Sequence, residues 1–247
     1  MHARIRAAGL IVVGLLAATP ASAQVVQSIQ FGGGLFSPRG FDSRADGDVL
    51  RRDFDGRPLN GAPNLTDALV FDIADFRTGN VFGEWSVGVG KHLEFGAGIG
   101  FAQRAVPSVY LDVVDQSGRD IDQTLKLQIV PMTAVVRFLP FGGPGTVQPY
   151  IGAGIGAVRY RYSEFGRFVD SDTLDIFSDR FTATGTAPAG VILGGVKFPL
   201  GGDIYSMSLE GRYLRAVGDT GGLPNNFLGD KIDLSGGMFN VGFQVRF

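Results

Sequence analysis

The sequence predicts an all-β fold, an eight-stranded antiparallel up-and-down transmembrane β-barrel. Apolar and polar residues alternate with period two in many segments, as in "FNVGFQVRF" at residues 239–247, and such alternation indicates strands whose two faces meet different surroundings. The 247 residues include 38 glycines and 20 phenylalanines, and strand glycines are useful where a sheet curves tightly or a neighbour approaches closely. Cysteine is absent, which excludes a disulfide framework and a thiolate metal site.

Residues 1–23 are predicted to be a cleaved signal peptide, which leaves residues 24–247 as the barrel domain. A basic start with Arg4 and Arg6 precedes an apolar run over residues 7–18, and Ala21-Ser22-Ala23 forms an A-x-A cleavage site. An uncleaved anchor is the weaker alternative, because this run gives only about 18 Å of helix against about 30 Å of hydrocarbon.

Residues 27–138 contain four segments that alternate as strands do. They lie at about 27–36, 80–90, 93–101 and 124–138, and a long polar stretch at about 38–77 follows the first of them. Only Lys91 and His92 separate the second from the third, which predicts a tight hairpin.

The fourth segment changes parity. Leu125 and Ile129 stand at odd positions, whereas Met132 and Phe138 stand at even ones, and Pro131 lies at the change. We interpret Pro131 as a strand bulge, in which one extra residue restores the facing.

Four further strands complete the set, at about 149–162, 182–198, 204–214 and 237–247, with polar loops at about 163–181 and 218–232. The connections between strands alternate between long and short. Four long polar loops are therefore expected at one end of the barrel, and the tight turns and both termini are expected at the other end. Because an even number of antiparallel strands can close on itself, the sheet needs no exposed edge.

The last strand presents its apolar residues at every second position: Phe239, Val241, Phe243, Val245 and Phe247. With the signal peptide, the loop pattern and the segments "QPYIGAGIG" and "IVPMTAVVRF", the mature chain resembles the small outer-membrane barrels of Gram-negative bacteria, of the OmpW-like and OmpA-like families. This resemblance implies an outer-membrane location, loops at the cell surface and a terminal strand that the barrel-assembly machinery reads as its assembly signal. It implies no appended peptidoglycan-binding domain.

Physical chemistry favours the barrel over a secreted soluble β-sandwich, the main alternative. No apolar run after residue 23 is long enough for a membrane helix, and lipid admits only helices or closed barrels because it cannot satisfy exposed backbone groups. A sandwich would use the same alternation to face a protein core, but it gains nothing from glycines on its polar faces.

Seven charged residues are predicted by strand parity to point into the lumen: Glu84, Glu94, Arg137, Lys197, Glu210, Arg212 and Arg246. A narrow barrel holds side chains but little solvent, so these charges must pair. We expect Glu84 or Glu210 to pair with Arg212, and Glu94 to pair with Arg137 or Arg246. The set is interpreted as a plug that stiffens the barrel, in preference to a gate for ions or a small solute.

Motifs for catalysis are sparse, and we expect neither an enzyme nor a cofactor or metal. "GAGIG" occurs twice, at residues 96–100 and 152–156, but both copies lie within strands with no helix after them, so they are read as glycines that make room. His92 is the sole histidine of the mature chain. It lies in a predicted periplasmic turn, whereas the resemblance implies an outer-side histidine in the enzymes of this class.

Charged residues of the long loops are the remaining candidates. Two acidic clusters offer oxygen ligands for calcium or magnesium, although solvated loops explain them more simply: Asp46, Asp48, Asp53 and Asp55, and Asp170, Asp172 and Asp175. Five first-loop arginines are candidates for pairing with lipopolysaccharide phosphates: Arg39, Arg44, Arg51, Arg52 and Arg57.

The predicted function is that of a non-enzymatic integral outer-membrane protein with an envelope-structural or surface-interaction role. A narrow OmpW-like channel for small or hydrophobic solutes is the alternative, and an outer-membrane enzyme the second alternative. The expected partners are the lipid bilayer, lipopolysaccharide and the barrel-assembly machinery, and the barrel is expected to be a monomer. Acidic residues outnumber basic ones, 24 to 22, so no nucleic acid partner is expected.

Overall fold

The computed structural model describes residues 25–142 and 146–247, so the predicted signal peptide lies outside the described residues. Within these ranges eight strands form one ring: β1 (Val25–Pro38), β5 (Thr78–Val89), β6 (Leu93–Val114), β7 (Asp120–Phe138), β8 (Gln148–Val169), β9 (Ile176–Pro199), β10 (Tyr205–Asp219) and β12 (Gly236–Arg246).

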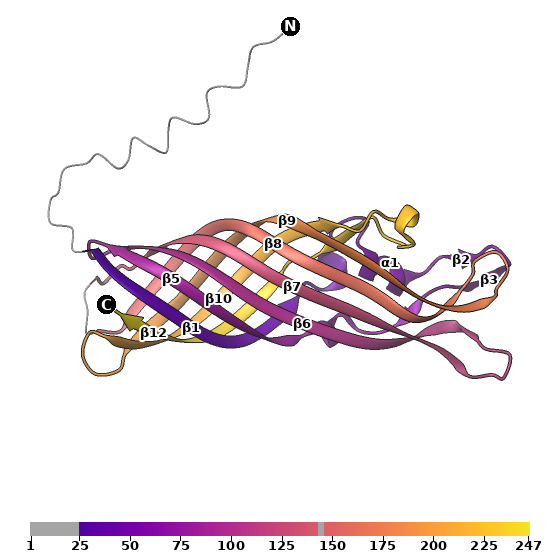
Figure 1. The fold of residues 1–247 in the computed structure, drawn as a ribbon, viewed down its shortest axis with the longest axis horizontal. Helices are drawn as coiled ribbons and strands as arrows, with labels where there is room; N and C mark the ends of the chain where they lie inside the picture. Colours follow the sequence, from indigo (N-terminus) through magenta and orange to yellow (C-terminus); the bar gives the residue numbers. More distant parts are fainter. Residues whose placement is uncertain (1–24, 143–145) are drawn as a thin grey trace, which may run out of the picture.

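Every strand of the ring pairs antiparallel with both of its neighbours. The ring closes where β1 pairs with β12, for example Phe31 with Phe243. The predicted eight-stranded barrel is therefore confirmed, and the two stacked sheets of a sandwich are excluded. The barrel is elongated, and the start of β1 and the C-terminus lie at the same end (Figure 1).

The opposite end carries the short elements of the connections: η2 (Phe41–Ser43), α1 (Val49–Asp55), β2 (Pro58–Leu59), β3 (Ala62–Thr66), β4 (Leu69–Val70), η3 (Ile73–Phe76), η4 (Leu223–Asn225) and β11 (Lys231–Asp233). Helix α1 begins after Asp48, whose side chain accepts a hydrogen bond from the Arg51 backbone N–H. Val49 and Leu50 are fully buried, so α1 packs its apolar side into this end of the barrel. Among the described residues, no helix has the length and apolar character needed to cross a membrane.

Several strands are much longer than the about 9 to 11 residues that span a bilayer. β6 and β8 have 22 residues each and β9 has 24. The polar loop predicted at about 163–181 is therefore wrong in extent, because β8 continues to Val169 and β9 starts at Ile176. Above the apolar part of the barrel the outer face of a strand meets water, so polar residues suit the sheet there.

The parity change at Pro131 is not a bulge, and this prediction is wrong. Glu94 pairs with Arg137 on one side of Pro131 and Ala102 with Ile129 on the other, with the same offset. On the other flank β8 pairs with β7 residue by residue, without a register shift. The strand keeps its facing throughout, and what changes is the chemistry of its surroundings.

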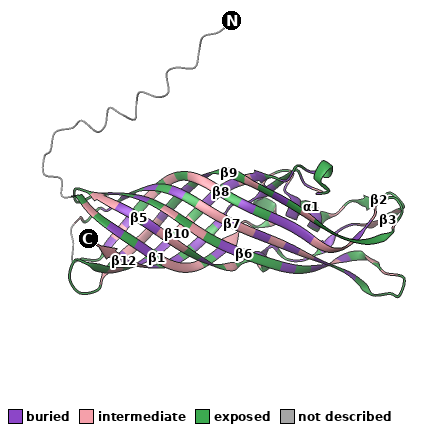
Figure 2. Ribbon diagram, in the orientation of Figure 1, coloured by how far each residue is buried: buried purple, intermediate pink, exposed green. Residues whose placement is uncertain are grey.

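This change divides the barrel into two parts. On the side of the termini the outward residues are apolar or glycine, for example over residues 81–89, 93–101, 130–138, 149–157, 190–198, 205–213 and 239–247, and we call this band the outer belt. Beyond it the polarity reverses, and Leu125, Leu127 and Ile129 of β7 point inward into a buried core. Figure 2 shows the alternation of buried and exposed residues along the strands.

Candidate functional site

A network of charged side chains fills the lumen at the level of the outer belt. Glu84, Glu94 and Arg137 come from the consecutive strands β5, β6 and β7, and they are buried on the inner face. The register sets Glu94 directly opposite Arg137. Lys197 of β9 and Glu210 of β10 reach the same region from the far wall and are also buried.

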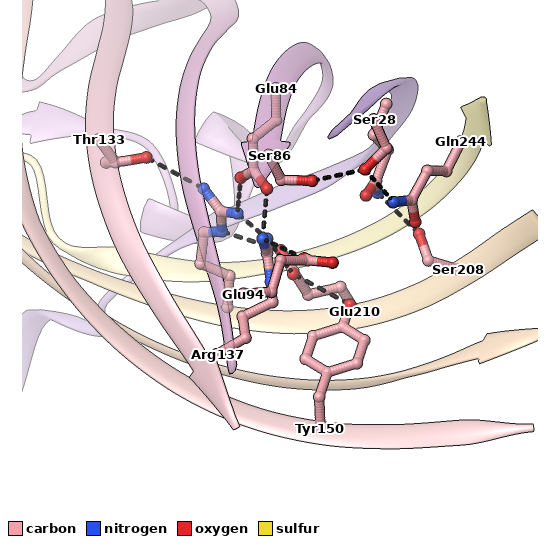
Figure 3. Close-up of polar contacts among 12 residues, drawn as sticks. Ser28, Glu84, Ser86, Glu94, Thr133, Arg137, Tyr150, Ser208, Glu210 and Gln244 are labelled. Atoms are coloured by element: carbon pink, nitrogen blue, oxygen red, sulfur yellow. Dashed lines mark hydrogen bonds and ion pairs between the residues drawn. The ribbon is translucent and has the colours of Figure 1, made fainter. Parts of the chain in front are cut away.

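Arg137 is the centre of this network (Figure 3). Its Nη1 pairs with Glu84 Oε1 and lies 3.2 Å from Glu94 Oε1, while its Nη2 lies 3.0 Å from Glu210 Oε2. The phenol of Tyr150 also donates to Glu210 Oε2, at 3.1 Å. One guanidinium thus joins carboxylates from three strands.

Two further cations complete the network. Arg212 Nη2 lies 3.1 Å from Glu84 Oε2 and 2.8 Å from Glu210 Oε1, and Lys197 Nζ lies 2.5 Å from Glu94 Oε2. Within the described chain the network therefore joins the carboxylates of Glu84, Glu94 and Glu210 to the cations of Arg137, Lys197 and Arg212. Formal charge is balanced, which is what a dry lumen requires.

Arg246 lies apart from this network. In the part of the chain that the structure describes, it forms no ion pair with Glu94, whose two oxygens are taken by Arg137 and Lys197. It lines instead a small cavity of about 20 Å³ toward the terminal end, with Gln148 and Ser206. Of the two partners predicted for Glu94, the structure has Arg137.

The glycines of the first "GAGIG" segment make room for the network. A Cβ added to Gly96 would lie 2.8 Å from Glu84 Oε1 and 3.0 Å from Arg137 Nη1. A Cβ on Gly98 would lie 3.1 Å from Glu84 Cγ. The inner wall is therefore bare where the charged side chains cross the lumen.

Polar side chains fill the lumen next to the network, on the terminal side. The hydroxyls of Ser28 and Ser86 are 2.8 Å apart, Gln30 Nε2 donates to Ser208 Oγ at 2.7 Å, and Gln244 Nε2 donates to Ser28 Oγ at 2.5 Å. On the other side a cavity of about 20 Å³ borders Glu84 and Arg212, and such a volume holds about one water. Closer to the loops the lumen is filled by the apolar core.

The outward face of β12 carries the residues predicted as the assembly signal. Phe239 and Phe247 are exposed on the barrel surface, as is Val241. The ring of Phe243 packs against Phe31 of β1, with centroids 5.5 Å apart. Val245 pairs with Ile29 of β1.

His92 lies in the turn between β5 and β6, at the end of the barrel that holds the C-terminus. Its Nδ1 is 2.9 Å from the carbonyl oxygen of Leu139 in a neighbouring turn. This contact joins two adjacent turns, and the described residues place no carboxylate within an ion-pair distance of the ring.

The prediction that the first acidic cluster belongs to a solvated loop is wrong, because two of its members are buried. Asp48 is 1 % exposed, and its carboxylate accepts hydrogen bonds from Nε and Nη2 of Arg44 at 2.5 and 3.0 Å. Asp53 is 2 % exposed and accepts a hydrogen bond from Tyr162 Oη at 3.1 Å. The long-range contacts that bury α1 could not be read from the loop's composition. Among the described residues, no group of three or more carboxylates or histidines is arranged to hold a metal ion.

Four of the five arginines proposed for lipopolysaccharide are engaged within the chain. Besides Arg44, Arg57 lies 3.1 Å from Asp67, and Arg51 and Arg39 lie 3.5 Å from Asp55 and Asp233. Sequence reasoning missed a different basic group, the outward side chains of Lys126, Arg159 and Arg161 on β7 and β8. If the two-residue alternation had been followed to the loop-side ends of β7 and β8, it would have predicted that these three basic side chains point outward.

No family model matches this chain, and no curated protein does either. Similar solved structures include Ail, the attachment invasion locus protein of Yersinia pestis, crystallised with the heparin analogue sucrose octasulfate (12 % identity, 90 % of this chain and 99 % of that one, TM-score 0.41). Neisserial surface protein A is similar at 12 % identity, over 90 % and 96 % of the chains, with a TM-score of 0.40.

The N-terminal β-barrel domain of Pseudomonas aeruginosa OprF is similar at 13 % identity, over 91 % of this chain and 98 % of that one, with a TM-score of 0.35. The ring of strands in this chain forms an eight-stranded antiparallel barrel with an apolar outer belt and a charged, closely filled lumen.

Proposed function

We propose that this chain is a non-enzymatic integral protein of the Gram-negative outer membrane, with an envelope-structural or surface-interaction role. The outer belt supports the membrane location. It exposes large apolar side chains such as Ile155, which is 75 % exposed, and Ile151 and Ile192, at 68 % and 63 %. Soluble monomers rarely expose continuous apolar surface of this kind, and the belt spans about the 9 to 11 residues per strand that cross a bilayer.

The filled lumen favours a structural role over conduction. Its network joins three carboxylates to three cations, and the side chain of Arg137 at its centre is 1 % exposed. An ion or solute would have to break these pairs to pass, and removing one partner of a buried pair costs about 3–5 kcal/mol. The charge-balanced network is the single observation that carries the proposal of a plug.

Single-channel recording in a planar bilayer tests the plug directly. We expect the purified parent to be silent. The Glu84→Ala, Glu210→Ala double variant, in which Arg137 and Arg212 lose carboxylate partners, is compared with Asp122→Asn, a change at an exposed side chain of β7. Steady openings of the parent would contradict the plug in favour of the narrow channel. A double variant that is folded and as silent as the parent would remove the gate.

Cell fractionation tests the location. The chain is expected in the membrane fraction and in solution only after detergent extraction, because the belt requires an apolar solvent. Recovery of folded chain from the soluble periplasmic fraction would contradict it. In this proposal the terminal end faces the periplasm, so that the tight turns and His92 lie on the periplasmic side and α1 lies at the cell surface.

The position of His92 argues against an enzyme. The side chain lies in a turn at the terminal end and its ring contacts the Leu139 carbonyl, far along the barrel from the long connections (Figure 1). Surface-exposed loops are where specificity for a partner is usually carried, so a surface interaction would use the end that holds α1.

The barrel-assembly machinery is a proposed partner through β12. Phe239, Phe243 and Phe247 stand on the outward face of the strand that closes the ring against β1. Deletion of Phe247 is expected to reduce the amount of assembled barrel in cells, while the purified variant still folds in detergent. Equal assembly of the truncated chain would contradict this role.

Lipopolysaccharide is a proposed partner through the basic group just beyond the belt. Lys126, Arg159 and Arg161 face outward on neighbouring strands, and within the described residues none of them forms an ion pair. Guanidinium groups suit phosphate. The triple change of these residues to glutamate should lower co-purified lipopolysaccharide relative to an Arg51→Glu, Arg52→Glu variant, and equal amounts would contradict the assignment.

A further inference from the structure

A second hollow lies at the loop end of the barrel, beyond the outer belt and separate from the charge network. It has a volume of about 210 Å³ and lies between α1 and the inner faces of β6, β7 and β8. A water molecule takes about 30 Å³ in the liquid, so the pocket is large enough for a small organic molecule.

Two buried acceptors in its wall lack hydrogen-bond donors. Gln123 is 4 % exposed and donates from Nε2 to Tyr110 Oη at 2.8 Å, but no described group donates to its Oε1. Glu164 is 6 % exposed and its Oε1 also has no partner in the described chain. Leu125 pairs with Glu164 and Gln123 with Gly166, so the two acceptors are diagonal neighbours on the inner face.

The pocket is also short of positive charge. Arg57 is the basic side chain of its wall, and its Nε lies 3.1 Å from Asp67. Asp53 accepts a hydrogen bond from the neutral phenol of Tyr162 and shares a side-chain hydrogen bond with Glu164. The two buried carboxyl groups of Asp53 and Glu164 therefore face each other without a cation, and a buried negative charge is costly unless it is paired.

An aromatic wall stands beside these carboxyls. Phe168 packs against Phe177 and Phe181, with ring centroids 5.8 and 4.8 Å apart, and all three line the pocket. Aromatic faces attract alkyl groups and organic cations. The pocket thus combines an anionic floor, unused acceptors and an apolar side.

We infer that this pocket binds a small primary amine, with the ammonium group donating to Gln123 Oε1 and Glu164 Oε1 and the carbon chain lying against Phe168, Phe177 and Phe181. The acceptors suit N–H donors, the pair of buried carboxyl groups suits a cation when it ionises, and the rings suit carbon. A metal ion would need several ligands, and no suitable group occurs among the described residues. The inference stands whether or not the barrel conducts.

Proton linkage supplies a second readout. Burial raises the pKa of Glu164 to about 8, and burial, then the nearby Glu164 carboxyl, raises the pKa of Asp53. The other titratable groups around this pair are Tyr162, Tyr110, Asp48 and Asp67, together with Arg57 and Asp170 of the pocket wall. An ammonium ion binds the ionised form, so affinity should rise by more than about tenfold between pH 6 and pH 9, a range in which an alkylamine stays protonated.

Isothermal titration of the full chain in detergent micelles with n-pentylamine tests the inference, with empty micelles as the blank. The neutral 1-pentanol and Mg²⁺ serve as comparison probes. Glu164→Gln and Gln123→Leu should each weaken pentylamine binding by about tenfold, as expected for a lost buried hydrogen bond. Asp122→Asn, on the outward face of β7 next to Gln123, is the matched control and should bind as the parent does.

Saturable pentylamine binding, weakened in both pocket variants and stronger at high pH, would support the inference. Equal binding of pentanol would overturn it in favour of a purely apolar pocket, and Mg²⁺ binding that pentylamine does not displace would overturn it in favour of a metal site. Absence of pentylamine binding to the folded parent would also overturn it. Thermal unfolding of each variant separates loss of binding from loss of fold.

Discussion

Replacing Arg137 with methionine removes the guanidinium at the centre of the luminal network while keeping an unbranched, flexible stem. The guanidinium contacts Glu84, Glu94 and Glu210. After the change, Glu84 and Glu210 keep Arg212 at 3.1 and 2.8 Å, and Glu94 keeps its lysine partner at 2.5 Å. No carboxylate is left wholly alone, but the balanced network acquires one uncompensated negative charge.

The expected loss in the free energy of unfolding is about 3–5 kcal/mol, the usual cost of removing one partner from a buried ion pair. Arg137 and its partners are at most 9 % exposed at the side chain, so water cannot replace the lost cation. Arg246 provides a matched control, because it makes no ion pair among the described residues. Its change to methionine should alter stability by no more than about 0.5 kcal/mol.

Trp85 is a built-in probe for the measurement. It is the single tryptophan of the chain, and it stands on the outward face of β5 within the belt, 48 % exposed on the bare barrel. Urea unfolding of the barrel in lipid vesicles would move its indole from lipid to water. The fluorescence transition therefore gives the midpoint and the slope for each variant.

A second change tests whether charge balance is the cause. Adding Glu84→Gln to Arg137→Met leaves two carboxylates facing two cations, so the double variant should regain at least about half of the lost stability, since a neutralised buried site is often well tolerated. If Arg137→Met alone lies within about 1 kcal/mol of the parent, or if Glu84→Gln makes it less stable, the reasoning about a dry lumen fails.

Three more predictions follow from the same geometry. Gly96→Val should cost about 1–3 kcal/mol through overpacking against the network, while Gly190→Ala, where an added Cβ meets nothing within 4 Å, should unfold like the parent in urea. Ile155→Arg within the belt should cost about 2–4 kcal/mol in vesicles, and Thr182→Arg beyond it, opposite Ser163, should be near neutral; equal costs would contradict the belt. Burial raises the pKa of Glu164 from 4.5 to about 8, so its proton contributes stability that is complete below about 4.5 and is lost as pH rises through about 8. Thermal unfolding between pH 6 and pH 9 should show this fall, and Glu164→Gln should reduce it, because burial still raises the pKa of Asp53.

Local patterning predicted much of the barrel. Two-residue alternation located the eight strands, since a strand between lipid and a polar lumen has to alternate. The same parity placed Glu84, Glu210 and Arg212 on one inner face, where the structure has them paired. That prediction needed only the direction of each side chain.

The same reasoning failed where the surroundings changed along a strand. At Pro131 the inward residues pass from Thr133 to Ile129, from a polar lumen to an apolar core, with no change of register. Alternation shows that the two faces of a strand differ in polarity, but it does not show which face points into the barrel. The exchange of polarity between the inner and outer faces at Pro131 was therefore mistaken for a change in the direction of the side chains. For the same reason polar residues of the long hairpins looked like loops.

The sequence by itself determined the number of strands, their facing within the belt and the composition of the lumen, because these follow from the residue types along each strand. Only the tertiary structure decided that Arg137 is the centre of the network, that α1 packs inside the barrel with Asp53 beside Glu164, and that a pocket remains above it. Those contacts join residues far apart in the chain, and their partners are chosen by ring closure and register, which no local pattern encodes.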